Sequence, residues 1–190
     1  QDKGRPGPSR PPVSGMRASI AHGVQLTPGQ MRALAKDGTS VVHCPSANLK
    51  LGSGIAAVAR MRAAGVTVGL GPDGAPCNNN LDPWLEMRHA ALVSSAAAGP
   101  GALPAREVLR LATIDGARVL GLADEIGSLE VGKSADLVVV STLGPHAAPA
   151  PDPVSTLVYA TQARDVEHVF VAGRSLVKNG VLSTLDAESV

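Results

Sequence analysis

Three polar side chains in this sequence, His22, His43 and Asp73, lie at or just beyond the ends of short apolar stretches. Imidazole nitrogens and carboxylate oxygens bind divalent metals and transfer protons near neutral pH. If the apolar stretches are parallel strands, their carboxyl ends meet at the edge where α/β folds hold ligands. We therefore expect these three residues to form one candidate site.

Each of these residues also has a simpler interpretation when taken alone. Asp73 precedes Gly74, and an Asp before a Gly is most often a turn former. A single histidine such as His22 is more often a packed or hydrogen-bonding side chain than a catalytic one. His43 stands beside Cys44, but the absence of a second cysteine at ligand spacing disfavours a structural zinc site.

The apolar stretches alternate with helical patterns, which is typical of a parallel α/β architecture. Thr27, Pro28 and Gln30 predict the start of a helix, and Gly38 predicts its end. The expected elements are strands at residues 17–21, 40–44 and 66–70, helices at 28–37, 55–64, 81–97 and 104–120, and loops at 49–54 and 75–80. The predicted fold class is therefore α/β.

The character of the sequence changes near Asp124. Residues 126–140 and 166–182 combine glycine turns with β-branched runs, which predicts a small β unit. A short helix is expected at 154–160. The predicted organisation is a disordered or truncated lead-in at 1–15, an α/β part at 16–123, and a β unit with the carboxy-terminal tail at 124–190.

Composition narrows the classes of partner. A net charge of +1 with scattered arginines gives no basic surface for nucleic acid. No apolar run approaches the roughly 20 residues that a membrane span needs, and no signal-peptide pattern is present. Two cysteines form no disulfide framework, so we expect a reducing, cytoplasmic setting.

Several other polar residues are assigned more modest roles. Cys77 follows Asp73 by four residues, has no evident activating base, and is expected at most to line a pocket. The asparagines at 78–80 are expected to cap and shape a loop. The remaining carboxylates and histidines are expected to be solvated, ion-paired with an arginine such as Arg88, or at the surface: Asp37, Glu86, Glu107, His89, His146 and His168.

Four blocks of the sequence, taken together, carry a family resemblance. They are AHG at 21–23, VHCPSANLKLGSGI at 42–55, GLGPDGA at 69–75 and CNNNLDPWLEMR at 77–88, with further agreement at 112–122 and 126–139. In this order they resemble the carboxy-terminal half of the amidohydrolase superfamily, in its cytosine/adenosine deaminase and triazine chlorohydrolase branch. The resemblance covers about residues 16–182.

The resemblance implies the last strands of a (β/α)8 TIM-like barrel and part of a small β-sandwich. By this likeness Asp73 ends the eighth strand, where it binds the metal and shuttles a proton. His22 ends the sixth strand, where it orients the attacking water or the substrate. The expected substrate-binding residues are His22, His43, Asn48 and Cys77.

The implied reaction is hydrolytic deamination, or dechlorination, of a purine, pyrimidine or triazine-like ring. The implied cofactor is a divalent metal, with zinc preferred and iron as the alternative. Such a metal lowers the pKa of bound water from 15.7 to about 7. The expected partner is a small heterocyclic substrate.

The His-x-His pair and the later histidine and glutamate of this family have no counterpart in the chain. One Asp and one His do not complete a catalytic zinc site, which takes about three protein ligands. We therefore expect a fragment that is inactive alone and that associates as a homo-oligomer or with a complementing amino-terminal half. The alternative is a noncatalytic interaction or scaffold piece.

Overall fold

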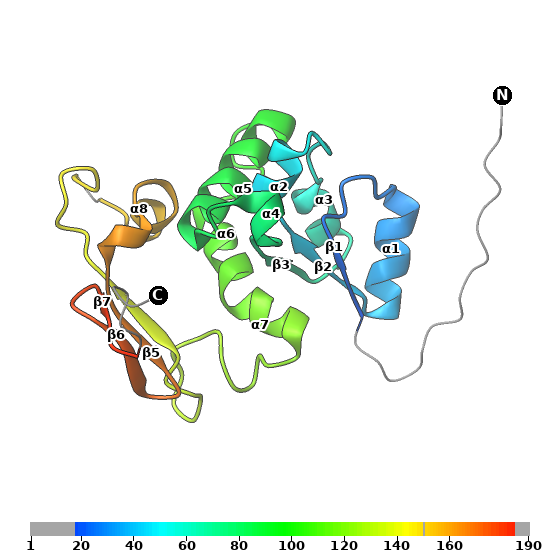
Figure 1. The fold of residues 1–190 in the computed structure, drawn as a ribbon. Helices are drawn as coiled ribbons and strands as arrows, with labels where there is room; N and C mark the ends of the chain where they lie inside the picture. The colour runs from blue at the N-terminus through cyan, green and yellow to red at the C-terminus, as the bar shows by residue number, and fades with distance from the viewer. Residues whose placement is uncertain (1–17, 150, 185–190) are drawn as a thin grey trace.

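A computed structural model describes residues 18–149 and 151–184, and the predicted lead-in at 1–15 lies outside them. Its first part is a three-stranded parallel sheet in the order β1-β2-β3 with helices packed on it (Figure 1). The elements are β1 (Ser19–Ala21), α1 (Pro28–Asp37), β2 (Ser40–His43), α2 (Pro45–Lys50), α3 (Val58–Ala63), β3 (Val68–Leu70), α4 (Ala75–Asn78), α5 (Pro83–Ala98), α6 (Ala105–Ala112) and α7 (Ile114–Leu120). The predicted α/β alternation is confirmed.

The register of the parallel sheet aligns the ends of its strands. Ala21 at the end of β1 lies opposite Val42, and Leu70 at the end of β3 lies opposite His43. Val41 and Val68 pair at the centre of the sheet and have no exposed surface, because α3, α5 and α6 contribute to the same apolar cluster. The polar residues after the strands therefore emerge at one edge.

Helix α1 begins and ends where the sequence predicts. The Thr27 hydroxyl accepts a hydrogen bond from the Gln30 amide, and the Thr27 amide donates to the Gln30 side chain, which completes a capping box. Gly38 closes the helix with a φ of 69°, a conformation that glycine adopts without steric cost.

Three expectations about local structure are wrong. Residues 45–50 form α2, which is not expected and overlaps the loop predicted at 49–54, and residues 75–78 form the short α4 within the loop predicted at 75–80. Helix α2 lacks a side-chain cap at Cys44, so the usual signal for a helix start is missing. The single helix expected at 104–120 is two helices, because Thr113 leaves the helical region with φ −126° and ψ −104°.

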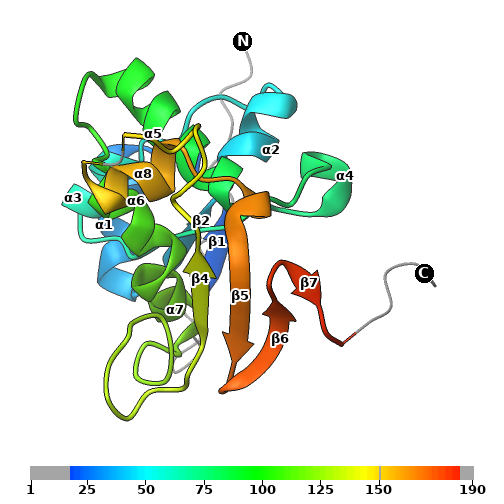
Figure 2. The ribbon, with the colours of Figure 1, turned by 90° about the vertical axis from the view of Figure 1, so that its left-hand side faces the viewer.

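The second part of the chain contains a four-stranded antiparallel sheet in the order β4-β5-β6-β7 (Figure 2). Its elements are β4 (Leu137–Val140), α8 (Pro153–Tyr159), the 3-10 turn η1 (Ala163–Asp165), β5 (Val166–Val171), β6 (Arg174–Lys178) and β7 (Val181–Leu182). Lys133 donates to the Ala123 carbonyl and the Ser128 hydroxyl at 2.6 Å each, and these hydrogen bonds stabilise the segment that connects α7 to β4.

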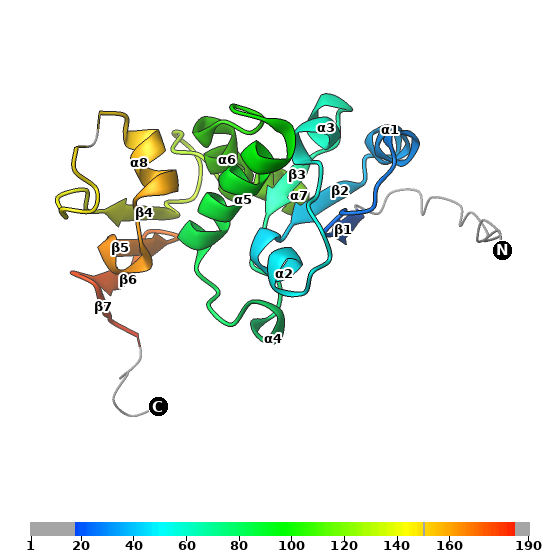
Figure 3. The ribbon, with the colours of Figure 1, turned by 90° about the horizontal axis from the view of Figure 1, so that it is seen from above.

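Helices α5, α6 and α7 lie between the two sheets (Figures 1 and 3). Helix α8 comes from the second part of the sequence yet packs against α5 and α6, and its fully buried Val158 belongs to the main apolar cluster. The chain thus returns to the first core between β4 and β5. The division at residue 124 and the β-sandwich remain predictions.

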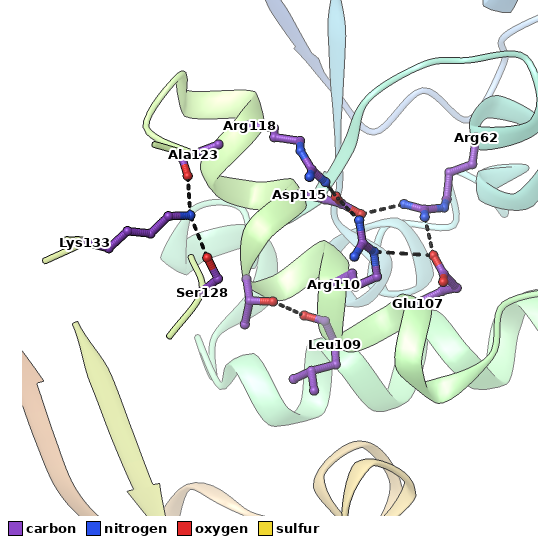
Figure 4. Close-up of polar contacts among 10 residues, drawn as sticks. Arg62, Glu107, Leu109, Arg110, Asp115, Arg118, Ala123, Ser128 and Lys133 are labelled. Carbon is purple, nitrogen blue, oxygen red and sulfur yellow. Dashed lines mark hydrogen bonds and ion pairs between the residues drawn. The ribbon is translucent and has the colours of Figure 1, made fainter. Parts of the chain in front are cut away.

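A charged cluster joins the helices at the amino-terminal end of β3 (Figure 4). We call it the Asp115 cluster, and it consists of Arg62 on α3, Glu107 and Arg110 on α6, and Asp115 and Arg118 on α7. Glu107, expected to be solvated or paired with an arginine, pairs with Arg62, as expected. Asp37 is exposed, as expected.

Across residues 18–149 and 151–184, no helix combines the length and apolar character needed to cross a membrane.

Candidate functional site

The three residues singled out in the sequence lie at the carboxyl edge of the parallel sheet. His22 follows β1, His43 is the last residue of β2, and Asp73 comes three residues after β3. The Nε2 atom of His22 lies 3.7 Å from the Oδ2 atom of Asp73, which is too long for a hydrogen bond but close enough for an electrostatic contact. Strands β1 and β3 thus direct an imidazole and a carboxylate toward each other.

His22 and Asp73 both have left-handed backbone conformations, with φ of 68° and 65°. Such conformations are unfavourable for residues with a Cβ and concentrate at functional sites. Two hydrogen bonds from backbone amides hold them here: the His22 amide donates to the Val42 carbonyl at 2.8 Å, and the Gly74 amide donates to the side-chain Oδ1 of Asp73 at 2.7 Å. Because Oδ1 is occupied, Oδ2 is the atom that faces His22.

His43 lies beneath this pair and is 1% exposed. Neither of its ring nitrogens has a hydrogen-bond partner within the described part of the chain. Burial, and secondarily the nearby His22 ring, lower the pKa of His43 from 6.5 to about 4. The His43 imidazole is therefore neutral at physiological pH.

This shift predicts a pH dependence of stability. Unfolded His43 titrates near 6.5 and folded His43 near 4, so the unfolded chain binds more protons between these values. Stability from neutral His43 is complete above pH 6.5 and falls as the pH drops toward 4. Between pH 7 and pH 4 we expect the metal-free protein to lose about 3 kcal/mol more than a His43→Gln variant.

Urea unfolding of both proteins at several pH values measures this difference. The other titrating groups are shared, so subtracting one profile from the other isolates His43. Parallel profiles for the two proteins would show that His43 does not carry the shift.

Two further residues expected at the site lie nearby in the structure. Asn48 on α2 is 2% exposed, and neither its Nδ2 nor its Oδ1 has a partner in the part of the chain that the structure describes. Cys77 is half-buried on α4 with a free thiol. Cys44 is buried, and desolvation followed by the charge of Asp73 raises the pKa of its thiol to about 11, so it is inert at neutral pH.

The expectation that Glu86 is solvated or paired with Arg88 is wrong. Glu86 is 1% exposed and accepts hydrogen bonds from the Ser46 amide at 3.2 Å and from Asn78 Nδ2 at 2.6 Å. His89, expected at the surface, is partly buried with its Nδ1 2.8 Å from Ser46 Oγ. The asparagine run shapes the loop as expected, because Asn78 Oδ1 accepts from the amides of Asn80 and Leu81.

The other two histidines are also engaged. His146 is partly buried, with Nε2 2.8 Å from Asp165 Oδ2, and His168 stacks on Phe170 with ring centroids 6.2 Å apart. Both lie outside the carboxyl edge of the parallel sheet.

An open hollow of about 400 Å³ adjoins His22. Its lining comes from the loop after β1, the start of α1 and the loop after α2: His22, Gly23, Val24, Gln25, Leu26, Gln30 and Ser53. In the described residues no three His, Cys, Asp or Glu side chains are placed to hold a metal ion. His22 and Asp73 are suitable donor types, but they make an incomplete ligand set.

Comparison with known proteins identifies the family of the chain. A model described as "Amidohydrolase family" matches residues 12–176. The chain belongs to the amidohydrolase family. Relatives of this amidohydrolase chain include the 5-methylthioadenosine/S-adenosylhomocysteine deaminases of Moorella thermoacetica, 48% identical over 171 residues, and of Halobacterium salinarum, 45% identical over 172 residues. These alignments cover 90% of the chain and 40% and 39% of the relatives.

Solved structures agree. An adenosine deaminase from Xanthomonas campestris with bound zinc is 40% identical with a TM-score of 0.88, covering 90% of this chain and 39% of the other. The zinc complex of the atrazine chlorohydrolase TrzN from Arthrobacter aurescens is 31% identical with a TM-score of 0.83, covering 90% and 38%. The amidohydrolase chain thus spans about two fifths of the length of the proteins it matches.

Proposed function

We propose that this chain is the carboxy-terminal part of a metal-dependent amidohydrolase that removes an amino group from a purine-type ring by hydrolysis. The observation that carries the proposal is the placement of Asp73 Oδ2 opposite His22 Nε2 at the strand-end edge. Deamination is favoured over dechlorination because the similarity to the adenosine-type deaminases is higher than that to the chlorohydrolase.

Asp73 would contribute a carboxylate ligand to a divalent metal, zinc in preference to iron. The metal would lower the pKa of a water molecule, which could then lose a proton near neutral pH and become nucleophilic. Asp73 Oδ2 is the free oxygen that would accept the proton and return it to the leaving amine. His22, 39% exposed at its side chain, would orient the water or the substrate.

The remaining site residues suit a neutral heterocycle. Asn48 and the uncharged His43 offer buried donors and acceptors, and Cys77 would line the pocket with a polarisable thiol. Ring nitrogens and exocyclic amino groups present the complementary pattern, so these residues would fix the orientation of the ring.

The incomplete donor set in the described residues favours a second candidate, a noncatalytic interaction piece. Under the main proposal, the missing ligands come from the portion of the protein that corresponds to the other three fifths of the relatives. The expected protein partner is that portion, or a second copy of this chain in a homo-oligomer. The free thiols of Cys44 and Cys77 support a reducing, cytoplasmic setting.

The test is ammonia release from 5-methylthioadenosine and S-adenosylhomocysteine by the complete protein. We expect turnover that chelation abolishes and that zinc or iron restores, whereas the 190-residue chain alone is inactive. Full turnover by protein shown to be metal-free would overturn the metal-dependent mechanism. Chloride release from a chlorotriazine without ammonia release from either nucleoside would overturn the assignment of substrate.

A further inference from the structure

Glu86 connects the two segments that follow β2 and β3, through α2 and α4. It is a buried carboxylate on the first turn of α5, and its two oxygens accept from different segments. Oε2 accepts from the amide of Ser46, the second residue of α2, and Oε1 accepts from Nδ2 of Asn78, the last residue of α4, which follows Asp73 by five residues. A carboxylate buried to this degree is stable only when such partners compensate its desolvation.

Asn78 extends the connection to the residue beside Asp73. Its Nδ2 donates to the Pro72 carbonyl at 2.7 Å as well as to Glu86, and its Oδ1 accepts from the amides of Asn80 and Leu81 at 3.1 Å each. All four of its hydrogen-bonding capacities are therefore used. One side chain holds both ends of the segment 72–81.

That segment needs such restraint. Three residues in it other than glycine, Asp73, Asn79 and Leu81, have positive φ values of 65°, 70° and 55°. Conformations of this kind persist only where surrounding contacts over-determine them. Within the segment, α4 has only four residues, so its own backbone hydrogen bonds supply little cooperativity.

We propose that Glu86 and Asn78 are positioning residues that hold Asp73 facing His22. Neither touches the reacting atoms; they act through the Pro72 carbonyl and the loop geometry. The consequence for catalysis rests on the proposed function, whereas the consequence for loop order does not. The two can therefore fail separately.

The first test is amide hydrogen exchange in the purified protein. Glu86→Gln keeps the volume but places an amide donor against one of two existing donors, so one hydrogen bond is lost. We expect exchange of the amides of residues 77–81 to accelerate about tenfold, while those of β2 stay unchanged. Glu167→Gln, an exposed carboxylate on β5, is the matched control and should change neither.

A reciprocal exchange of side chains separates positioning from packing. Asn78→Asp places a carboxylate against Glu86 and should loosen the segment, whereas Asn78→Asp combined with Glu86→Gln restores a donor and acceptor pair. The double variant should therefore exchange more slowly than Asn78→Asp alone. The proposal would be overturned by equal amide exchange rates in the single and double variants. It would also be overturned if the amides of β2 exchanged faster by the same factor as those of residues 77–81.

In the complete protein, Glu86→Gln should lower kcat about tenfold and leave KM within twofold, because the displaced group acts in the chemical step. A normal kcat together with faster amide exchange of residues 77–81 would overturn the catalytic consequence. Absence of deaminase activity in the unsubstituted protein would refute the proposed function and leave the exchange result standing.

Discussion

Replacing Asp73 by Asn in the complete protein is expected to lower kcat about 1,000-fold or more. Asn has nearly the same shape and also tolerates the left-handed backbone that Asp73 adopts, and its Oδ1 can still accept from the Gly74 amide. What it lacks is a basic oxygen opposite His22. The loss is therefore assigned to proton transfer and metal binding rather than to folding.

The measurement is steady-state ammonia release, with the metal content of each protein determined separately. Asp82→Asn is the matched control, because Asp82 caps α5 through its Oδ1 and Asn caps helices equally well. We expect that control to stay within twofold of the unsubstituted protein. If Asp73→Asn kept more than about a tenth of the original kcat, Asp73 would not be the proton carrier.

The sequence places the candidate residues well because the relevant signals are local. The strand end before Asp73 follows from an apolar run bounded by glycines, and the start of α1 follows from the pairing of Thr27 with Gln30. The shared edge then follows from the rule that parallel strands present their carboxyl ends together. Short-range patterns of this kind depend little on the rest of the fold.

Glu86 shows where such reasoning stops. Its partner Ser46 lies 40 residues away in sequence, so its hydrogen bond depends on how α5 packs across α2. A charged residue in the first turn of a helix is ordinarily solvated, which made the simple expectation wrong. The available signal was periodicity: the buried face of α5 is formed by Glu86, Met87, Ala90, Ala91 and Ser94. A carboxylate on an apolar face requires a partner, and that requirement could have identified it.

His43 and Asn48 mark a second limit. The family resemblance predicts that both bind substrate, and the structure buries both, with ring and amide atoms that lack partners among the described residues. Buried polar atoms without partners cost free energy. Sequence patterns indicate which residue types are present, whereas only the packed structure reveals unmet hydrogen-bonding capacity.

At neutral pH, the largest effect on stability that we expect lies in the Asp115 cluster. Asp115 has a side chain only 6% exposed, and the guanidinium groups of Arg62, Arg110 and Arg118 converge on it (Figure 4). Replacing Asp115 by Ala leaves Arg62 and Arg110 with Glu107 as their carboxylate partner and leaves Arg118 with none in the cluster. The three guanidinium groups are 25–46% exposed, so solvent compensates part of the lost attraction, and we expect a loss of about 2 kcal/mol in the free energy of unfolding at neutral pH.

Urea unfolding at neutral pH measures this loss, and Arg118→Ala provides the contrast. The side chain of Arg118 is 46% exposed, so solvent compensates its removal and the expected loss is below about 1 kcal/mol. Arg62, at 25% exposed, bridges α3 to both α6 and α7, and a double-mutant cycle between Arg62 and Asp115 should show strong coupling. Equal, small losses for Asp115→Ala and Arg118→Ala would mean that apolar packing alone joins these helices. A large loss confined to the Asp115 and Arg62 variants would instead show that this ion-pair cluster joins α3 to α6 and α7 at the end of β3 opposite Asp73.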